Sequence, residues 1–258
     1  MTQQTSISFK VISSPQLADI AVKGDTFTHS ELNHNRSIIQ FDPVIKSGVV
    51  RFEITNFRGV YGVGVSEESL IYKGNEEPDA RGKGKFVYQH WSGAIHHTED
   101  SWIEDNSSYG SGHHIAMELN MDVIPRTLTF FYDSILQKNY VVNIPPAMRF
   151  WVYLYNEGTS FQITKFERLS NPSASQQQLD QQKKYEYGKL WVSDKVRDFS
   201  TGNEGRIPRR RTKHIDSEQL EEKQQQPKKK LTEKEKKELE KEQKKREEEE
   251  QKIREKEE

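Results

Sequence analysis

Short apolar runs separated by polar turns fill the first two thirds of the chain. Between Ile7 and Phe166 the runs are rich in β-branched and aromatic residues, and Gly, Asn, Asp and Pro stand between them. This alternation is typical of an all-β antiparallel sandwich, and no helix of ordinary length is predicted before residue 176. We predict strands at residues 7–12, 38–41, 49–55, 60–65, 86–89, 115–119, 127–131, 140–142, 150–155 and 160–166.

The clearest single pattern is GHHIAMELNMDVIPRTLTFFYDS at residues 112–134. In its first half Ile115 and Leu119 alternate with Ala116 and Glu118, so the two pairs face opposite sides of one strand. Polar residues and Pro125 then form a turn, and a second apolar strand follows. We predict a β-hairpin whose first strand is half-buried.

The order of residues in this hairpin resembles the signature of the SPRY domain family. The matching positions are Gly112, Ile115, Ala116, Leu119 and Asn120, followed by Thr127, Leu128, Thr129, Phe130, Asp133 and Ser134. Other segments that resemble strands of the family are GVVRFEIT at 48–55, YGVGVS at 61–66, Ile144-Pro145-Pro146 and FWVYLYNEGTSFQITKF at 150–166. The match spans about residues 35–166, and His113, Asn120 and Ser134 depart from the family pattern.

The SPRY resemblance implies a concanavalin-like fold, a bent sandwich of two antiparallel sheets. It also implies that loops at one end of the sandwich form a preformed site for a short peptide of a partner protein. Aromatic residues in loops suit recognition because they supply contact area with few torsions to freeze, although the tryptophans could instead belong to the core. The candidate partner-binding residues in predicted loops are Trp91, His96, His97, Trp102 and Tyr109.

Composition divides the chain into unlike regions. Only 32% of the residues are hydrophobic and 31% are charged, so part of the chain cannot pack into a core. We predict a sandwich over residues 1–169, a polar linker over 170–188, a short segment with a basic run over 189–212, and a charged tail over 213–258 that is helical or disordered. The apolar residues near Trp191 form either a last element docked on the sandwich or a short partner-binding motif.

The basic run is Arg209-Arg210-Arg211 followed by Thr212, which matches a basophilic kinase site. Together with Lys228, Lys229 and Lys230 it also resembles a two-part nuclear import signal. Aromatic residues are not interleaved with this run, so we do not expect nucleic-acid binding.

The sequence lacks cysteine, a secretory signal and any apolar stretch near the length of a membrane span. We therefore expect an intracellular protein with no membrane partner, cytoplasmic and possibly nuclear.

Two clusters raise the question of catalysis or metal binding. Five histidines lie between His90 and His114, but adjacent histidines on a strand point to opposite faces and offer at most one ligand per side. Acidic residues around Trp102 could in principle act as acid and base, yet no nucleophile or phosphate-binding motif accompanies them. GVYGVG at 59–64 precedes no helix and is predicted to be a strand. We predict no catalytic residues, no metal site and no cofactor.

We therefore predict a non-catalytic protein-interaction module that binds an unidentified protein or peptide. Two alternatives stay open. One is a carbohydrate-binding sandwich in which Trp91 or Trp102 stacks on a sugar ring. The other is a scaffold or nucleic-acid-associated protein that acts through its basic segment and charged tail.

Overall fold

The computed structural model describes residues 4–12, 15–98 and 102–192. All of these lie in the first of the two units into which the chain divides, Met1–Asp198. The second unit, Phe199–Glu258, lies outside the described residues. The predictions made for the basic run, for Thr212, for Lys228–230 and for the charged tail therefore also lie outside them.

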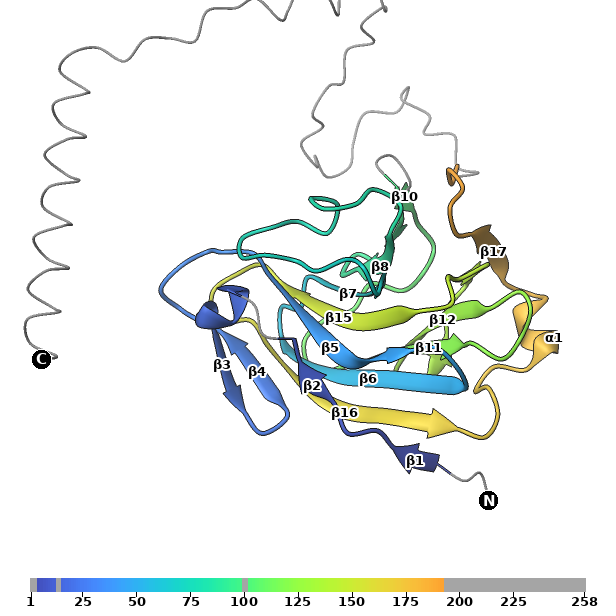
Figure 1. The fold of residues 1–258 in the computed structure, drawn as a ribbon, viewed down its shortest axis with the longest axis horizontal. Coiled ribbons are helices and arrows are strands. Elements are labelled where there is room, and N and C mark those ends of the chain that lie inside the picture. The colour runs from blue at the N-terminus through green and yellow to red at the C-terminus, as the bar shows by residue number, and fades with distance from the viewer. Residues whose placement is uncertain (1–3, 13–14, 99–101, 193–258) are drawn as a thin grey trace, which may run out of the picture. The chain divides into compact units, whose positions relative to one another are not determined.

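Two β-sheets form a sandwich, and every strand pair in them is antiparallel except β14 with β17 (Figure 1). The first sheet has the order β17 (Lys183–Glu186), β14 (Asn139–Val142), β12 (Thr127–Tyr132), β11 (His114–Asn120), β6 (Val49–Arg58), β16 (Ser160–Leu169), β4 (Thr26–His29), β3 (Ile20–Lys23), with β1 (Gln4–Ser6) on β16 and β13 (Ile135–Leu136) on β12. The second has the order β10 (Trp102–Ile103), β9 (Ile95–His96), β8 (Phe86–His90), β7 (Gly62–Glu67), β15 (Met148–Leu154), β5 (Ser37–Ile45), β2 (Lys10–Val11).

Each of the ten predicted strands overlaps a strand of the structure, so the predicted all-β sandwich is confirmed. The only helices among the described residues are a 3₁₀ helix at Pro15–Asp19 and the single turn α1 (Gln176–Leu179). None of the helices in the described part of the chain is long and apolar enough to cross a membrane.

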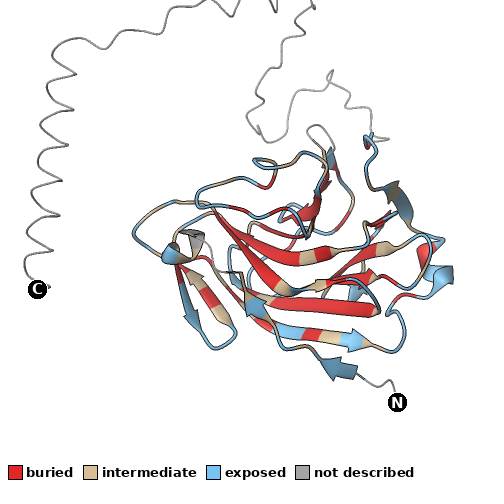
Figure 2. Cartoon of the chain, in the orientation of Figure 1, coloured by how far each residue is buried: buried red, intermediate tan, exposed pale blue. Residues whose placement is uncertain are grey.

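Buried residues concentrate on the strands of the two sheets, and the core lies between them (Figure 2). This core is rich in phenylalanine. Phe52 of the first sheet stacks on Phe150 of the second with ring centroids 5.2 Å apart, and Phe166 meets both rings edge-on. On β11 the inward residues are Ile115, Met117 and Leu119, as the alternation predicts. Burial of these rings supplies the main driving force for joining the two sheets.

The outer face of the second sheet carries a layer of aromatic side chains. Tyr88 of β8 and Trp151 of β15 lie over β7, with their ring centroids 5.6 Å apart. Beneath them β7 has Gly62 and Gly64, and a Cβ on Gly64 would lie 2.5 Å from the Trp151 ring and 2.6 Å from Tyr88 Cβ. The glycines of β7 are therefore required by close approach of neighbouring side chains.

The outer face of the first sheet carries a buried ionic network. Arg51 pairs with Glu53 at 2.9 Å and lies 3.7 Å from the carboxylate of Glu118, with its guanidinium 4.5 Å from the ring centroid of Phe131. Burial alone would raise the pKa of Glu53, but the hydrogen bonds from Arg51 and Lys165 outweigh it and hold that pKa below its usual value. The charges are thus stabilised by one another inside the fold.

The prediction of a polar linker at 170–188 is wrong, because this segment packs on the first sheet. Ser173 donates its backbone N–H to Glu118 over 2.8 Å, so this segment covers the ionic network. Leu179 then packs with Phe131 and Tyr140 on the outer face of the first sheet. The segment looks like a linker in sequence because it covers a polar surface and needs few apolar residues to do so.

The chain then forms the edge strand β17 and returns to the core at Trp191. His97 fixes this return because its Nδ1–H donates to the Phe86 carbonyl over 2.6 Å, and its Nε2 accepts from Gly188 N–H over 2.7 Å. The indole of Trp191 stacks on the His97 ring with centroids 5.0 Å apart. Docking of Trp191 on the sandwich is one of the two interpretations that the sequence left open.

Replacement of Gly64 by Ala should lower the free energy of unfolding by about 1 to 3 kcal/mol, because a methyl group there overlaps the layer above it. Gly110→Ala is the matched control, since its nearest atom would be 3.9 Å away. Denaturant unfolding of both variants checks this. Equal stability of the two variants would contradict the close packing over β7.

Trp191→Ala should destabilise the domain by about 3 kcal/mol, because it removes a buried indole from the core. Val192→Ala, at the neighbouring exposed position, should change the stability by less than about 0.5 kcal/mol. Denaturant unfolding followed by tryptophan fluorescence measures both. A harmless Trp191→Ala would contradict the docking of Trp191 in the core.

Candidate functional site

The aromatic layer of the second sheet becomes exposed at its β10 edge. Trp102 of β10 lies opposite His96 of β9, which in turn lies opposite Tyr88 of β8. These side chains share the outer face, with ring centroids 5.4 Å apart for Tyr88 and His96 and 4.9 Å apart for His96 and Trp102. The buried rings of Tyr88 and His96 therefore support the Trp102 indole from the side of the sheet.

A second set of rings joins this row through His90. The centroid of His90 lies 5.3 Å from Trp91, 5.3 Å from Trp102 and 4.7 Å from Tyr61. Tyr61 in turn lies 5.0 Å from Tyr155. We call Tyr61, His90, Trp91, Trp102 and Tyr155 the aromatic surface. Its two indoles are the exposed members, at 47% for Trp91 and 41% for Trp102.

The histidine in this surface is neutral at physiological pH. Burial, helped by the neighbouring His96, lowers the pKa of His90 to about 4. Ser92 donates its backbone N–H to His90 Nδ1 over 3.3 Å, which leaves Nε2 to carry the proton of the neutral ring. The His90 ring therefore adds no positive charge to the aromatic surface at pH 7.

Two of the predicted loop residues belong to the interior instead. Tyr109 is 4% exposed and donates its hydroxyl to the Gln89 carbonyl over 3.0 Å, so it packs in the core. His97 is fully buried and holds the C-terminal segment. The prediction that Tyr109 and His97 bind a partner from loops is therefore corrected. A hydroxyl or imidazole can be buried where a backbone group forms a hydrogen bond with it. His96 is also buried, directly beside Trp102.

The histidine cluster is divided among different surroundings. His90 and His96 lie in the aromatic layer and His97 lies beneath the C-terminal segment. His113 is exposed and lies 2.7 Å from the Asp133 carboxylate. Among the residues that the structure describes, no three His, Cys, Asp or Glu side chains are grouped as metal ligands would be.

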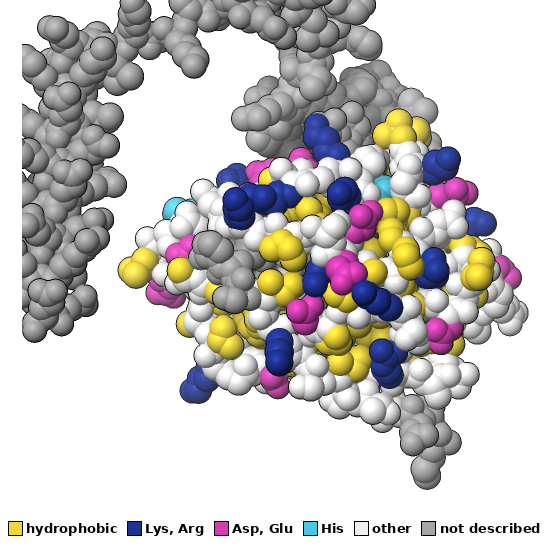
Figure 3. Space-filling model, viewed as in Figure 1, with side chains coloured by type: hydrophobic (Ala, Val, Ile, Leu, Met, Phe, Trp, Pro, Cys, Tyr) yellow, Lys and Arg dark blue, Asp and Glu magenta, His cyan; other side chains and the backbone are white. Residues whose placement is uncertain are grey.

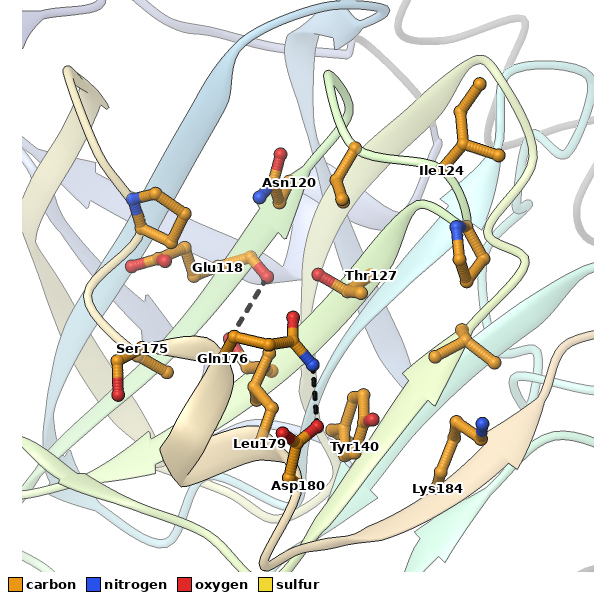
Figure 4. Close-up of a pocket in the computed structure, with 16 residues that line it drawn as sticks. Glu118, Asn120, Ile124, Thr127, Tyr140, Ser175, Gln176, Leu179, Asp180 and Lys184 are labelled. Carbon is orange, nitrogen blue, oxygen red and sulfur yellow. Dashed lines mark hydrogen bonds between the residues drawn. The ribbon is translucent and has the colours of Figure 1, made fainter.

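A groove of about 580 Å³ lies on the outer face of the first sheet, between α1 and the turn after β11 (Figure 4). Tyr140 and Leu179 supply apolar lining, and Thr127, Asp180 and Lys184 supply polar groups. The sequence prediction missed this groove because one of its walls comes from the supposed linker. A capping box did mark the helical turn, since Ser175 and Gln178 have the required spacing.

Comparison with solved structures returns SPRY domains. The crystal structure of a human SPRY domain is 17% identical, with 61% of this chain and 96% of that chain covered and a TM-score of 0.46. The SPRY domain of human HERC1 is 16% identical, with 57% and 92% covered and a TM-score of 0.44. The PSpry domain of TRIM65 is 13% identical, with 61% and 88% covered and a TM-score of 0.45.

No family model matches the chain, and no curated protein matches it. The segments quoted for the SPRY resemblance form strands in the structure: most of GVVRFEIT lies on β6, most of YGVGVS lies on β7, and the motif hairpin forms β11 and β12.

The free energy of unfolding should fall as the pH is lowered from about 6.5 towards 4. Burial holds the pKa of both His90 and His97 below the ordinary value, although the Phe86 carbonyl and Glu67 oppose it at His97. The unfolded chain therefore binds protons first, and stability that is present above pH 6.5 is lost below it.

For His90 the loss should reach about 1.4 kcal/mol for each pH unit between about 6.5 and 4, and His97 adds to the loss in the same direction. Denaturant unfolding at several pH values measures it, and His97→Gln should reduce the slope between pH 6.5 and pH 5. An unchanged slope in this variant would show that His97 is not protected from protonation.

Proposed function

We propose that this protein is a protein-interaction module that binds a short segment of a partner protein at the aromatic surface. The observation that carries this proposal is the exposure of Trp91 and Trp102 on a row of buried rings. Tryptophan is one of the residue types enriched among those that dominate binding energy at protein interfaces. The SPRY resemblance of the sequence supports the same class of function.

The surroundings of the two indoles favour binding with little loss of freedom. Trp102 belongs to a strand and is held by His96 and Tyr88, so its ring is already ordered before a partner arrives. Trp91 follows β8 directly, and its backbone N–H donates to the Tyr61 carbonyl over 3.0 Å while its carbonyl accepts from Tyr109 N–H over 2.9 Å. A partner therefore meets two anchors in fixed positions, which lowers the entropic cost of association.

Described residues close to the two indoles in sequence are also tightly packed. Gly93 has φ +89°, and a Cβ there would lie 2.1 Å from the Asn106 carbonyl oxygen. After Trp102, the side-chain oxygen of Asn106 accepts a hydrogen bond from the backbone N–H of Asn139 over 2.8 Å. The backbone N–H of Ser107 donates to the side-chain oxygen of Gln137 over 2.7 Å. These contacts hold Asn106 and Ser107 against the start of β14, and such support close to Trp102 preorganises a site for recognition.

Trp91→Ala and Trp102→Ala should each weaken peptide binding at least tenfold while leaving the fold intact, because truncation of an exposed anchor removes contact area without opening the core. The measurement uses the full chain, immobilised and exposed to a phage library of random 12-residue peptides, followed by titration of the selected peptides. Leu32→Ala is the control, since Leu32 is an exposed apolar residue outside the aromatic surface.

Equal affinity of the two tryptophan variants and the unchanged chain would contradict the proposed site. Selection of no peptide, together with binding to a glycan array, would contradict protein recognition and favour the carbohydrate alternative. Denaturant unfolding of each variant separates lost contacts from lost structure.

A further inference from the structure

The two exposed indoles of the aromatic surface carry N–H groups that can bind a ligand. Within the described part of the chain, neither Trp91 nor Trp102 donates its indole N–H to another residue. The buried Trp191 differs, because its indole N–H donates to the Glu186 carbonyl over 2.8 Å. An indole N–H donates a hydrogen bond and does not accept one. A ligand that contacts both exposed indoles therefore gains most from groups that accept hydrogen bonds.

The charge that the structure places over the aromatic surface already has a partner within the chain. The guanidinium of Arg36 lies 5.2 Å from the ring centroid of Tyr155 and pairs with Glu77 at 3.0 Å. Basic and acidic side chains are interspersed in the same way on the face of the molecule that Figure 3 shows. The His90 ring is neutral at pH 7, because burial lowers its pKa to about 4. A charged group would lose water at these rings without gaining an opposite charge, so the surface favours an uncharged ligand.

The two indoles are close enough for one short segment to contact both. The ring centroid of His90 lies 5.3 Å from Trp91 and 5.3 Å from Trp102, so a single ring links them. One turn of polyproline II takes three residues and rises about 9 Å, which is sufficient for a span of this kind. Because Trp102 is held in place by its neighbours before binding, a ligand that is also ordered in advance adds the least entropic cost.

We propose that the partner segment bound at the aromatic surface is rich in proline and binds as a polyproline II helix. Its proline rings pack on the indoles of Trp91 and Trp102, and its carbonyls accept hydrogen bonds from the indole N–H groups. This inference rests on the proposed function and names the chemistry of its ligand. Polyproline II has no internal hydrogen bonds, so its carbonyls are available to a partner. Proline also has no backbone N–H that would lose its hydrogen bond to water against a surface of rings.

The test exploits the four tryptophans of the chain, because each gives one indole N–H signal in a ¹⁵N–¹H spectrum. Acetylated hexaproline amide is titrated into the full chain, and an uncharged glycine–serine peptide of the same length is the flexible control. We expect hexaproline to shift the signals of Trp91 and Trp102, while those of the buried Trp151 and Trp191 stay in place. Equal shifts with both peptides, no shift with either, or shifts with the sugar cellobiose alone would overturn the inference.

Trp102→Phe keeps a ring at this position and removes its N–H. It should weaken binding of hexaproline about three- to tenfold, as expected for loss of one hydrogen bond between neutral groups. Trp102→Ala should weaken binding further, because the ring is lost as well. Phe57→Ala is the control, since Phe57 is an exposed ring on β6 of the first sheet, outside the aromatic surface. Full affinity of Trp102→Phe would contradict the hydrogen bond assigned to the indole.

The peptides selected from the phage library separate this inference from the function on which it rests. Enrichment of proline among peptides that lose affinity with Trp102→Ala would support both. Peptides that depend on Trp102 but are not enriched in proline would overturn the inference and leave the proposed function standing. Failure to select any peptide would overturn both.

Discussion

The close contact between the glycines of β7 and the rings above them allows aromatic side chains to cover the outer face of the second sheet. Because Gly62 and Gly64 have no side chains on the outer face, Tyr88 and Trp151 from the two neighbouring strands meet over β7. The outer face is thus covered by rings in mutual contact. The same layer continues across His96 to Trp102, so the packing that stabilises the sheet also holds the exposed indole.

The two outer faces of the sandwich are completed in different ways. The second sheet uses its own aromatic residues, together with Leu70 and Tyr72 from the loop between β7 and β8. The first sheet carries the ionic network around Arg51, and residues from Ser173 onward cover this network. An ionic network of this kind is stable only while its partners remain in place. The domain therefore extends to Trp191, beyond the point at which its motifs end.

Much of the fold could be predicted from sequence because strands with one buried face alternate visibly. The hairpin of β11 and β12 is an example, and so is the second half of GVYGVG, Gly62–Gly64, which begins β7. The covering segment could not be predicted, since Ser173 and its neighbours act through hydrogen bonds to buried charges and leave no apolar period. A pattern of hydrophobic positions does not report a polar interface inside the fold.

The candidate site was predictable only in part for a related reason. Aromatic residues in a glycine- and serine-rich segment indicate recognition or core equally well, and this segment contains both kinds. Trp91 and Trp102 are exposed, whereas Tyr109 is buried because the Gln89 carbonyl accepts its hydroxyl. Local sequence does not reveal such a long-range partner, and the groove beside α1 escaped prediction because its walls come from distant elements.

The most direct test of the central claim is to map the binding surface of a selected peptide on the full chain by backbone amide chemical shifts. Binding at the aromatic surface predicts shifts concentrated at residues 88–92 and 102–104, with the residues that line the groove unchanged. Shifts concentrated instead at Thr127, Leu179 and Lys184 would place recognition in the groove and contradict the assignment of function to Trp91 and Trp102.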